Sequence, residues 1–124
     1  MKKQVISKNA PGAIGPYSQG ITANGFLFVS GQTPIIPATG DIPEGIAAQT
    51  KQAFNNIKAI VEEAGGKMDN IVKCSVFLKN MNDFAEMNGA YKEFFNEPYP
   101  ARTTIEAARL PKDVNVEIDA IVAL

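Results

Sequence analysis

The sequence predicts an α+β fold, a mixed sheet with two helices on one face, and three observations support this class. Apolar residues recur at helical spacing in two segments and at every second position in several others. These segments follow one another as three strands, a helix, a strand, a helix and two strands, an order typical of α+β proteins. Two helices cover only one face of such a sheet, so solvent or another subunit must meet the second face, which carries polar residues at every other position.

The composition is that of a single domain spanning residues 1–124. Hydrophobic residues make up 45% of the 124 positions and charged residues 20%, which are ordinary values for a globular protein. A chain of this length buries enough surface for one core but not for two. Lys and Arg number 12 and Asp and Glu 13, so the net charge of −1 provides little attraction to nucleic acid or to an anionic membrane.

Histidine is absent and cysteine occurs once, at Cys74. The first absence excludes histidine-based catalysis and the usual zinc and iron sites, and a lone cysteine excludes an internal disulfide. No stretch approaches the ~18 apolar residues that a membrane-spanning helix needs. We therefore expect a cytoplasmic protein without a bound metal, a membrane partner or a dedicated nucleic-acid partner.

The first third of the chain predicts three short strands. Prolines and glycines interrupt residues 9–16, so this segment is predicted to be a loop. Asn24-Gly25 is a strong signal for a two-residue hairpin between the second and third strands, and the third is an apolar run predicted to be buried. The predicted strands cover residues 2–6, 17–22 and 26–30.

The clearest helix covers residues 44–64. Its apolar side is formed by residues at helical spacing, while its other side is polar. The apolar residues are Ile46, Ala53, Phe54, Ile57, Ile60, Val61 and Ala64. Gly65-Gly66 supplies the stop signal, and residues 33–43, which contain three prolines, are predicted to be the loop before the helix.

A strand over residues 71–79 and a helix over residues 82–95 come next. Asn80 or Asn82 can cap the helix, and Cys74 is predicted to be a small core residue because its strand face is apolar. The residues predicted to share that strand face are Val72, Cys74, Val76 and Leu78. Those predicted to lie along one side of the helix are Phe84, Met87, Asn88, Tyr91 and Phe95.

Two strands complete the predicted sheet, over residues 102–108 and 114–122. The second alternates aliphatic with polar side chains, so Glu117 and Asp119 share one face. Glu117 thus lies in an otherwise apolar strand, where burial would raise the pKa of its carboxyl group and suit it to proton transfer. On residue chemistry alone, a solvated sheet face is the more common interpretation, because Asp119 shares that face.

Arg102 is the second candidate for catalysis. Pro98 and Pro100 hold the approaching chain extended, so its guanidinium begins from a rigid position. A planar fork of donors suits two-point binding of a carboxylate. The alternatives, a surface arginine or a salt bridge between subunits, are more common when the residue is considered by itself.

Several polar residues are candidates for lining a ligand site. Tyr17 follows a stiff Gly-Pro turn and either offers a hydroxyl to a ligand or closes a core. Ser30-Gly31 ends a strand, where a glycine allows the backbone to approach a ligand closely, although a plain turn is the more common reading. Asn88 interrupts the apolar side of a helix, so it binds a ligand or pairs across an interface.

Taken together, the sequence resembles the RidA (YjgF-type) family of enamine and imine deaminases almost from end to end. Several separated motifs occur in the same order as in that family, which is far more specific than any single one. They are the segments 9–20, 29–32, 82–84 with Asn88, 100–102 with Ile105, 108–113 and 116–118.

The resemblance implies a chorismate-mutase-like fold and a homotrimer in which the sheets close into a central barrel with the helices outside. It also implies that Arg102 binds the substrate carboxylate and that Glu117 orients or activates the attacking water. The remaining residues of the implied site, in a cleft between neighbouring subunits, are Tyr17, Ser30, Gly31, Asn88 and Thr104. Thr104 stands where many members of the family have cysteine, so no thiol chemistry is expected there.

The activity implied by the resemblance is the hydrolysis of 2-imino acids, or of their 2-aminoacrylate-type enamine tautomers, to 2-oxo acids and ammonia. This hydrolysis needs no cofactor, because the imine carbon is already electrophilic and the enzyme mainly orients it and a water molecule. Two alternatives remain open: a regulatory trimer that binds small carboxylates without turnover, and a translation inhibitor or ribonuclease, as attributed to some relatives. The absence of histidine and the balanced charge argue against the last one.

Overall fold

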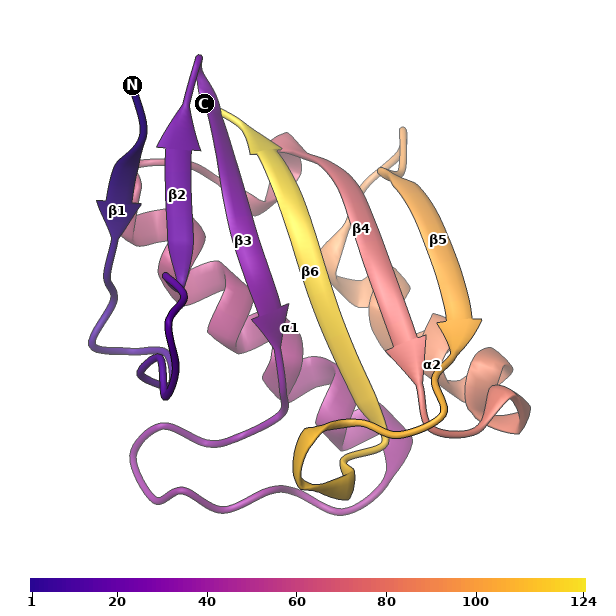
Figure 1. Ribbon diagram of the computed structural model, residues 1–124. Helices are drawn as coiled ribbons and strands as arrows, with labels where there is room; N and C mark the ends of the chain where they lie inside the picture. Colours follow the sequence, from indigo (N-terminus) through magenta and orange to yellow (C-terminus); the bar gives the residue numbers. More distant parts are fainter.

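The computed structural model describes residues 1–124 as one six-stranded sheet with both helices packed on the same face (Figure 1). The elements are β1 (Lys3–Val5), β2 (Gly20–Ala23), β3 (Phe26–Gln32), α1 (Ile46–Glu63), β4 (Ile71–Leu78), α2 (Phe84–Tyr91), β5 (Ala101–Glu106) and β6 (Val116–Ala123). The strand order in the sheet is β1-β2-β3-β6-β4-β5. Strands β4 and β5 are parallel and all other neighbours are antiparallel. The predicted α+β class and order of elements are confirmed.

The hairpin between β2 and β3 forms where the sequence predicts it. Asn24 and Gly25 have φ angles of 52° and 79°, and Ala23 pairs with Phe26 across a two-residue loop. Strand β2 begins at Gly20 and is shorter than the predicted range of residues 17–22. The side chain of the residue before it, Gln19, is bonded to the preceding loop. The buried side chain of Gln19 accepts a hydrogen bond from the N–H of Ser7 at 2.6 Å and donates one to the carbonyl of Pro11 at 2.8 Å.

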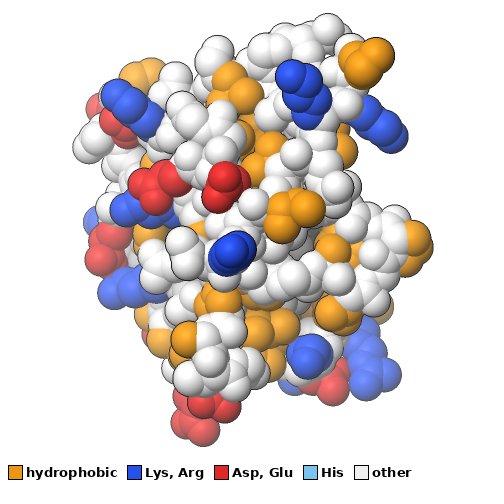
Figure 2. Space-filling view, turned by 90° about the vertical axis from the view of Figure 1, so that its left-hand side faces the viewer, with side chains coloured by type: hydrophobic (Ala, Val, Ile, Leu, Met, Phe, Trp, Pro, Cys, Tyr) orange, Lys and Arg blue, Asp and Glu red, His pale blue; other side chains and the backbone are white.

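The molecular surface beside β1 carries charges of both signs. Figure 2 shows Lys and Arg side chains interspersed with Asp and Glu on this side, with apolar side chains between them. The charges therefore do not gather into one basic patch on this side. In the whole chain, no helix is long and apolar enough to cross a membrane.

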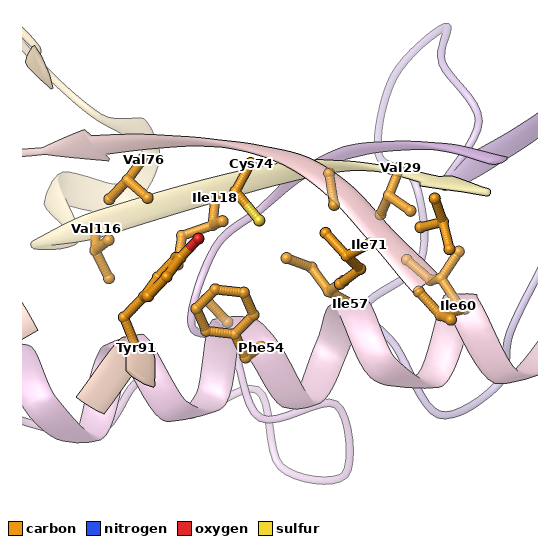
Figure 3. Close-up of a cluster of buried hydrophobic side chains, with 14 of the residues drawn as sticks. Val29, Phe54, Ile57, Ile60, Ile71, Cys74, Val76, Tyr91, Val116 and Ile118 are labelled. Atoms are coloured by element: carbon orange, nitrogen blue, oxygen red, sulfur yellow. The ribbon is translucent and has the colours of Figure 1, made fainter. Parts of the chain in front are cut away.

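Helix α1 packs its apolar side on the middle of the sheet (Figure 3). Phe54, Ile57 and Ile60 are fully buried there, and each such side chain contributes about 1.5–3 kcal/mol on burial. The helix ends at the predicted glycines, since the N–H groups of Gly65 and Gly66 bond back to carbonyls of the last turn at 3.0 and 2.9 Å. This helix is therefore the rigid support of the sheet.

Two predictions about buried strand faces are wrong in part. Strand β3 is predicted to be buried as a whole, yet Phe26 and Phe28 are 40% and 45% exposed, because only the alternate residues Leu27 and Val29 face the helices. In β4 the pairing with β6 is irregular after Ile71, so Ile71 and not Val72 is on the buried side. We call the side opposite the helices the helix-free face; it includes Phe26, Phe28, Phe77, Ile105, Glu117 and Asp119.

Helix α2 is shorter than the prediction of residues 82–95. Single 3₁₀ turns, residues 81–83 and 92–94, precede and follow it, and the side chain of Asn80 caps the first of them by accepting the N–H of Asn82 at 2.9 Å. Tyr91 is buried beside Phe54, with ring centroids 5.4 Å apart. The predicted apolar side is thus confirmed at Tyr91, Met87 and Phe95, whereas Phe84 is 38% exposed.

Candidate active site

The side chain of Arg102 lies between β5 and α2, on the helix-covered face of the sheet. Arg102 pairs with Cys74 of β4, which points toward the helices. Its Nη1 donates a hydrogen bond to Oδ1 of Asn88 at 2.7 Å. The centre of the guanidinium is 4.6 Å from the ring centroid of Tyr91 and 5.5 Å from that of Phe84, distances at which cation–π attraction operates. The guanidinium is therefore held in one orientation before any ligand arrives.

A cavity of about 440 Å³ opens beside this guanidinium. Its lining residues come from α2, the turn after it and the start of β5. They are Asn88, Tyr91, Lys92, Tyr99, Pro100 and Arg102. The side-chain oxygen of Asn88 accepts the hydrogen bond from Arg102. The side-chain nitrogen of Asn88 is therefore the group that can donate to a ligand. This cavity combines an oriented cation with amide and aromatic groups, which suits a small carboxylate.

Glu117 lies on β6, on the helix-free face, and is half-buried. Burial raises the pKa of its carboxyl group, and the negative charge of nearby Asp119 raises it further. A carboxylate whose pKa is raised toward neutral is a better proton acceptor than an ordinary surface glutamate. The environment of Glu117 therefore favours proton transfer.

An irregularity in β3 brings the backbone against this carboxylate. Val29 pairs with Ala120 and Gln32 with Ile118, so β3 has one extra residue between these pairs. A Cβ atom placed on Gly31 would lie 2.7 Å from Oε2 of Glu117, closer than real Cβ atoms approach. Glycine is thus required at this position for Glu117 to keep its place.

A second cavity, of about 690 Å³, opens beside Glu117. Four residues predicted from the sequence line it, namely Tyr17, Ser30, Gly31 and Glu117. The hydroxyl of Ser30 donates to the carbonyl of Ser18 at 2.6 Å, so its proton is already in use. Tyr17 is 49% exposed and is one of the residues that line the cavity.

The two cavities belong to different faces of the sheet. In one copy of the chain, Arg102 points toward the helices and Glu117 points away from them, and β4 lies between their strands. The two strands that carry these residues follow one another in the chain but are not neighbours in the sheet, and one copy does not bring Arg102 and Glu117 together. The predicted site residues are thus divided between the two cavities, with Arg102 at one and Glu117 at the other.

Two other predicted features have distinct outcomes. Thr104 shares the face of Arg102, but it lines neither cavity, and its buried hydroxyl has no hydrogen-bond partner. Cys74 is fully buried, and burial raises the pKa of its thiol to about 12, so it is a core residue as predicted. No group of three His, Cys, Asp or Glu side chains is placed to hold a metal ion.

Sequence reasoning missed several residues that line these cavities. Lys92 and Tyr99 stand beside Arg102, and Lys112 stands beside Glu117. Lys112 has a φ of 55° in the turn of residues 111–113, a left-handed conformation that is uncommon outside glycine. Its sequence signals are the Pro111 before it and its place in the motif of residues 108–113, whereas Tyr99 is marked by prolines on both sides.

Comparisons with known proteins show which family the chain belongs to. A family model described as endoribonuclease L-PSP matches residues 7–124. The 2-iminobutanoate/2-iminopropanoate deaminase of Escherichia coli K12 is 51% identical over 124 residues, covering 98% of this chain and 97% of that protein. A RutC family protein of Pyrococcus horikoshii is 54% identical over 122 residues, with the same two coverages of 98% and 97%.

Solved structures are similar over the same length. The crystal structure of Escherichia coli TdcF with bound serine has a TM-score of 0.95 and 46% identity, covering 98% of both chains. RidA from an Antarctic Psychrobacter has a TM-score of 0.95 and 40% identity, covering 98% of this chain and 99% of that one. With the family model matching almost the whole chain, the protein belongs to the endoribonuclease L-PSP family, the RidA family that its motifs indicate.

Proposed function

We propose that this protein is a 2-iminobutanoate/2-iminopropanoate deaminase, which hydrolyses reactive 2-imino acids to 2-oxo acids and ammonia. A relative at 51% identity bears that name. The observation that carries the proposal is the oriented guanidinium of Arg102, held by Asn88 and two aromatic rings beside a cavity of suitable size. The substrate is a small molecule, and the cytoplasmic location expected from the sequence stays a prediction.

The complete site is proposed to form between copies of the chain. Arg102 and Glu117 face opposite sides of the sheet, so a second copy must supply the missing half. The helix-free face supports this arrangement, because Phe26, Phe28 and Ile105 leave between 40% and 46% of their surfaces exposed on it. We propose a homotrimer whose sheets close into a central barrel, with the Arg102 cavity of one copy against the Glu117 cavity of the next.

The proposed reaction adds water across the C=N bond. Arg102 binds the carboxylate of the imino acid through two parallel N–H···O bonds, which fixes the imine carbon in place. Glu117 accepts a proton from water as the oxygen bonds to that carbon. Glu117 returns this proton to the nitrogen, which gives a tetrahedral carbinolamine. Glu117 then accepts the proton of the new hydroxyl group and passes it to the nitrogen as the C–N bond breaks, so that ammonia leaves and a 2-oxo acid remains. The chain's own residues supply each of these steps.

Mixing two inactive variants tests whether the site spans two copies. Arg102→Ala and Glu117→Gln each damage one half, so either protein alone should be nearly inactive. When equal amounts are unfolded and refolded together, about a quarter of the sites in a head-to-tail ring should receive both intact halves. The assay generates 2-iminobutanoate with threonine dehydratase and follows its trapping by semicarbazide.

Native mass spectrometry of the same mixture gives the assembly. A mass of about three times 13.3 kDa is expected. A mixture that stays inactive although hybrid trimers are present would refute a site shared between copies, and a mass of 13.3 kDa would refute the trimer.

Gly31→Ala should lower kcat by about tenfold or more, because the added Cβ displaces the carboxylate of Glu117 from its position. The matched control is Gly89→Ala in α2, where a Cβ meets no atom within 4 Å. That control should keep its activity and unfold at a slightly higher urea concentration, since alanine favours a helix. Equal kcat values for the two variants would show that the position of Glu117 does not matter.

RNA cleavage is the second candidate, because the family model is described as endoribonuclease L-PSP. The chain has no histidine to serve as general acid or base, and its net charge is −1. Both features favour imine hydrolysis. RNA cleavage that persists in Arg102→Ala protein at moderate salt would indicate a contaminating nuclease.

A further inference from the structure

Two amide side chains are buried on the face of α1 that packs against the sheet. Gln49 is 6% exposed and Asn56 is 1% exposed. A buried amide costs free energy unless its donors and acceptors are paired. The hydrogen-bond partners of these two amides therefore identify the segments that α1 fixes in place.

Asn56 binds the chain that leaves β3. Its Nδ2 donates to the carbonyl of Thr33 at 3.0 Å and to that of Ile35 at 2.9 Å. Its Oδ1 accepts a hydrogen bond from Nε2 of Gln52 at 2.9 Å, which fixes the orientation of the amide. Thr33 and Ile35 both line the Glu117 cavity. Asn56 thus holds one wall of that cavity.

Gln49 binds two segments at once. Its Nε2 donates to the carbonyl of Pro43 at 3.0 Å, and its Oε1 accepts the N–H of Asn115 at 2.7 Å. The carbonyl of Asn115 in turn accepts the N–H of Lys79 at 3.0 Å. Asn115 lies two residues before Glu117, so Gln49 holds the start of the strand that carries the carboxylate.

The loop of residues 33–43 has few other connections. Its tip is closed by its own hydrogen bonds, such as the N–H of Ile36 to the carbonyl of Asp41 at 2.8 Å. The hydrogen bonds that join this loop to the rest of the protein are those from Asn56 and Gln49. Figure 1 shows this loop and the segment before β6 at the same end of the sheet.

We infer that Asn56 and Gln49 are positioning residues, which act from α1 to place the cavity wall and Glu117 for the substrate. The inference rests on the proposed function and adds residues that touch no substrate. Asn56 acts on the wall and should therefore affect KM, whereas Gln49 acts on the strand of Glu117 and should affect kcat. A merely structural role would change stability without separating these two constants.

The test compares Asn56→Leu and Gln49→Met with Thr50→Val. The first two keep the approximate shape of the side chain and remove its hydrogen bonds. Thr50 is fully buried on the same helix, but its hydroxyl has no hydrogen-bond partner, so its replacement controls for a change in the core. With 2-iminobutanoate, Asn56→Leu should raise KM about tenfold and Gln49→Met should lower kcat about tenfold, while Thr50→Val changes neither.

Two measurements without turnover separate this inference from the proposed function. Amide hydrogen exchange of residues 33–43 should become faster in Asn56→Leu, and calorimetry should show weaker binding of 2-oxobutanoate. Should Asn56→Leu fail to fold, Gln52→Ala removes the hydrogen bond that orients Asn56 and should shift exchange and binding in the same direction. If the unchanged protein hydrolyses no imine, the proposed function fails, and these two measurements still decide the positioning role. Unchanged exchange, or unchanged binding of 2-oxobutanoate, would overturn it.

Discussion

Arg102→Ala should lower kcat/KM for 2-iminobutanoate by about 100- to 1000-fold, because two hydrogen bonds to a charged carboxylate contribute roughly 3–4 kcal/mol in total. The kcat/KM of Arg102→Lys should lie between the values for Arg102→Ala and the unchanged protein. Lysine keeps the charge, but it lacks the planar fork that Asn88 orients and that stacks on Tyr91. Steady-state kinetics of the trapped imine measure both effects.

The control for this prediction is Arg109→Ala. Arg102 and Arg109 are the two arginines of the chain, and Arg109 forms an exposed ion pair with Asp113 at 3.0 Å. Its removal changes the net charge by the same amount and should change kcat/KM less than twofold. If the two alanine variants behave alike, Arg102 does not bind the substrate carboxylate.

Glu117→Gln should lower kcat by about 100- to 10,000-fold, since an amide cannot accept the proton of the attacking water. Binding of 2-oxobutanoate should survive, because Arg102 is untouched. In the unchanged protein, kcat/KM should fall as the pH drops through the raised pKa of Glu117, and so at a higher pH than for an ordinary glutamate. A regulatory carboxylate-binding protein would instead bind 2-oxobutanoate and show no turnover before or after the change.

Asp119→Asn is the matched control for Glu117→Gln. Asp119 lies on the same face, and its charge raises the pKa of Glu117. Its Oδ1 accepts the N–H of Ser75 at 3.0 Å, a role that asparagine can keep. This variant should remain active and lose activity only at lower pH. If kcat/KM falls at the same pH in Asp119→Asn as in the unchanged protein, the fall at low pH does not arise from Glu117.

The raised pKa of Glu117 also predicts an effect on stability. At a pH between the pKa of Glu117 in the unfolded chain and its higher pKa in the folded protein, the folded state binds more protons than the unfolded state. The contribution of Glu117 to the free energy of unfolding therefore falls as the pH rises through this range. Above this range the ionised carboxylate is a net cost, which Glu117→Gln removes. The variant should therefore resist more urea at pH 7 and lose this advantage below about pH 4.3, the ordinary pKa of glutamate.

Local patterns in the sequence predicted most of the fold. Helical spacing and the following glycines predicted α1 closely, and Asn24-Gly25 predicted the hairpin, because both signals depend on neighbouring residues. The extra residues in β3 and β4 were not predictable, since an irregular register arises from the pairing of distant strands. Val72 was wrongly predicted to be buried because the irregular register shifts the alternation in β4 by one residue. Phe28 was wrongly predicted to be buried because apolar content does not show which face of a strand is covered.

The sequence proposed individual residues for the candidate site, but it did not predict how they are arranged. Spacing alone indicated that Glu117 and Asp119 share a face, and the structure agrees. It did not indicate that β4 lies between β5 and β6, because strand order depends on contacts far apart in the chain. In β5 the apolar Ile105 is on the helix-free face while Arg102 faces α2, the reverse of the usual pattern. Asn88 and aromatic rings make that reversal stable.

The burial of Cys74 gives the protein a reporter of its own unfolding. A thiol that is fully enclosed and protonated at neutral pH does not react with alkylating reagents while the chain is folded. Since no other cysteine exists, every labelled molecule has opened its core at least once. The rate of labelling in the native protein therefore measures how often the sheet and α1 separate, without any dye or added probe.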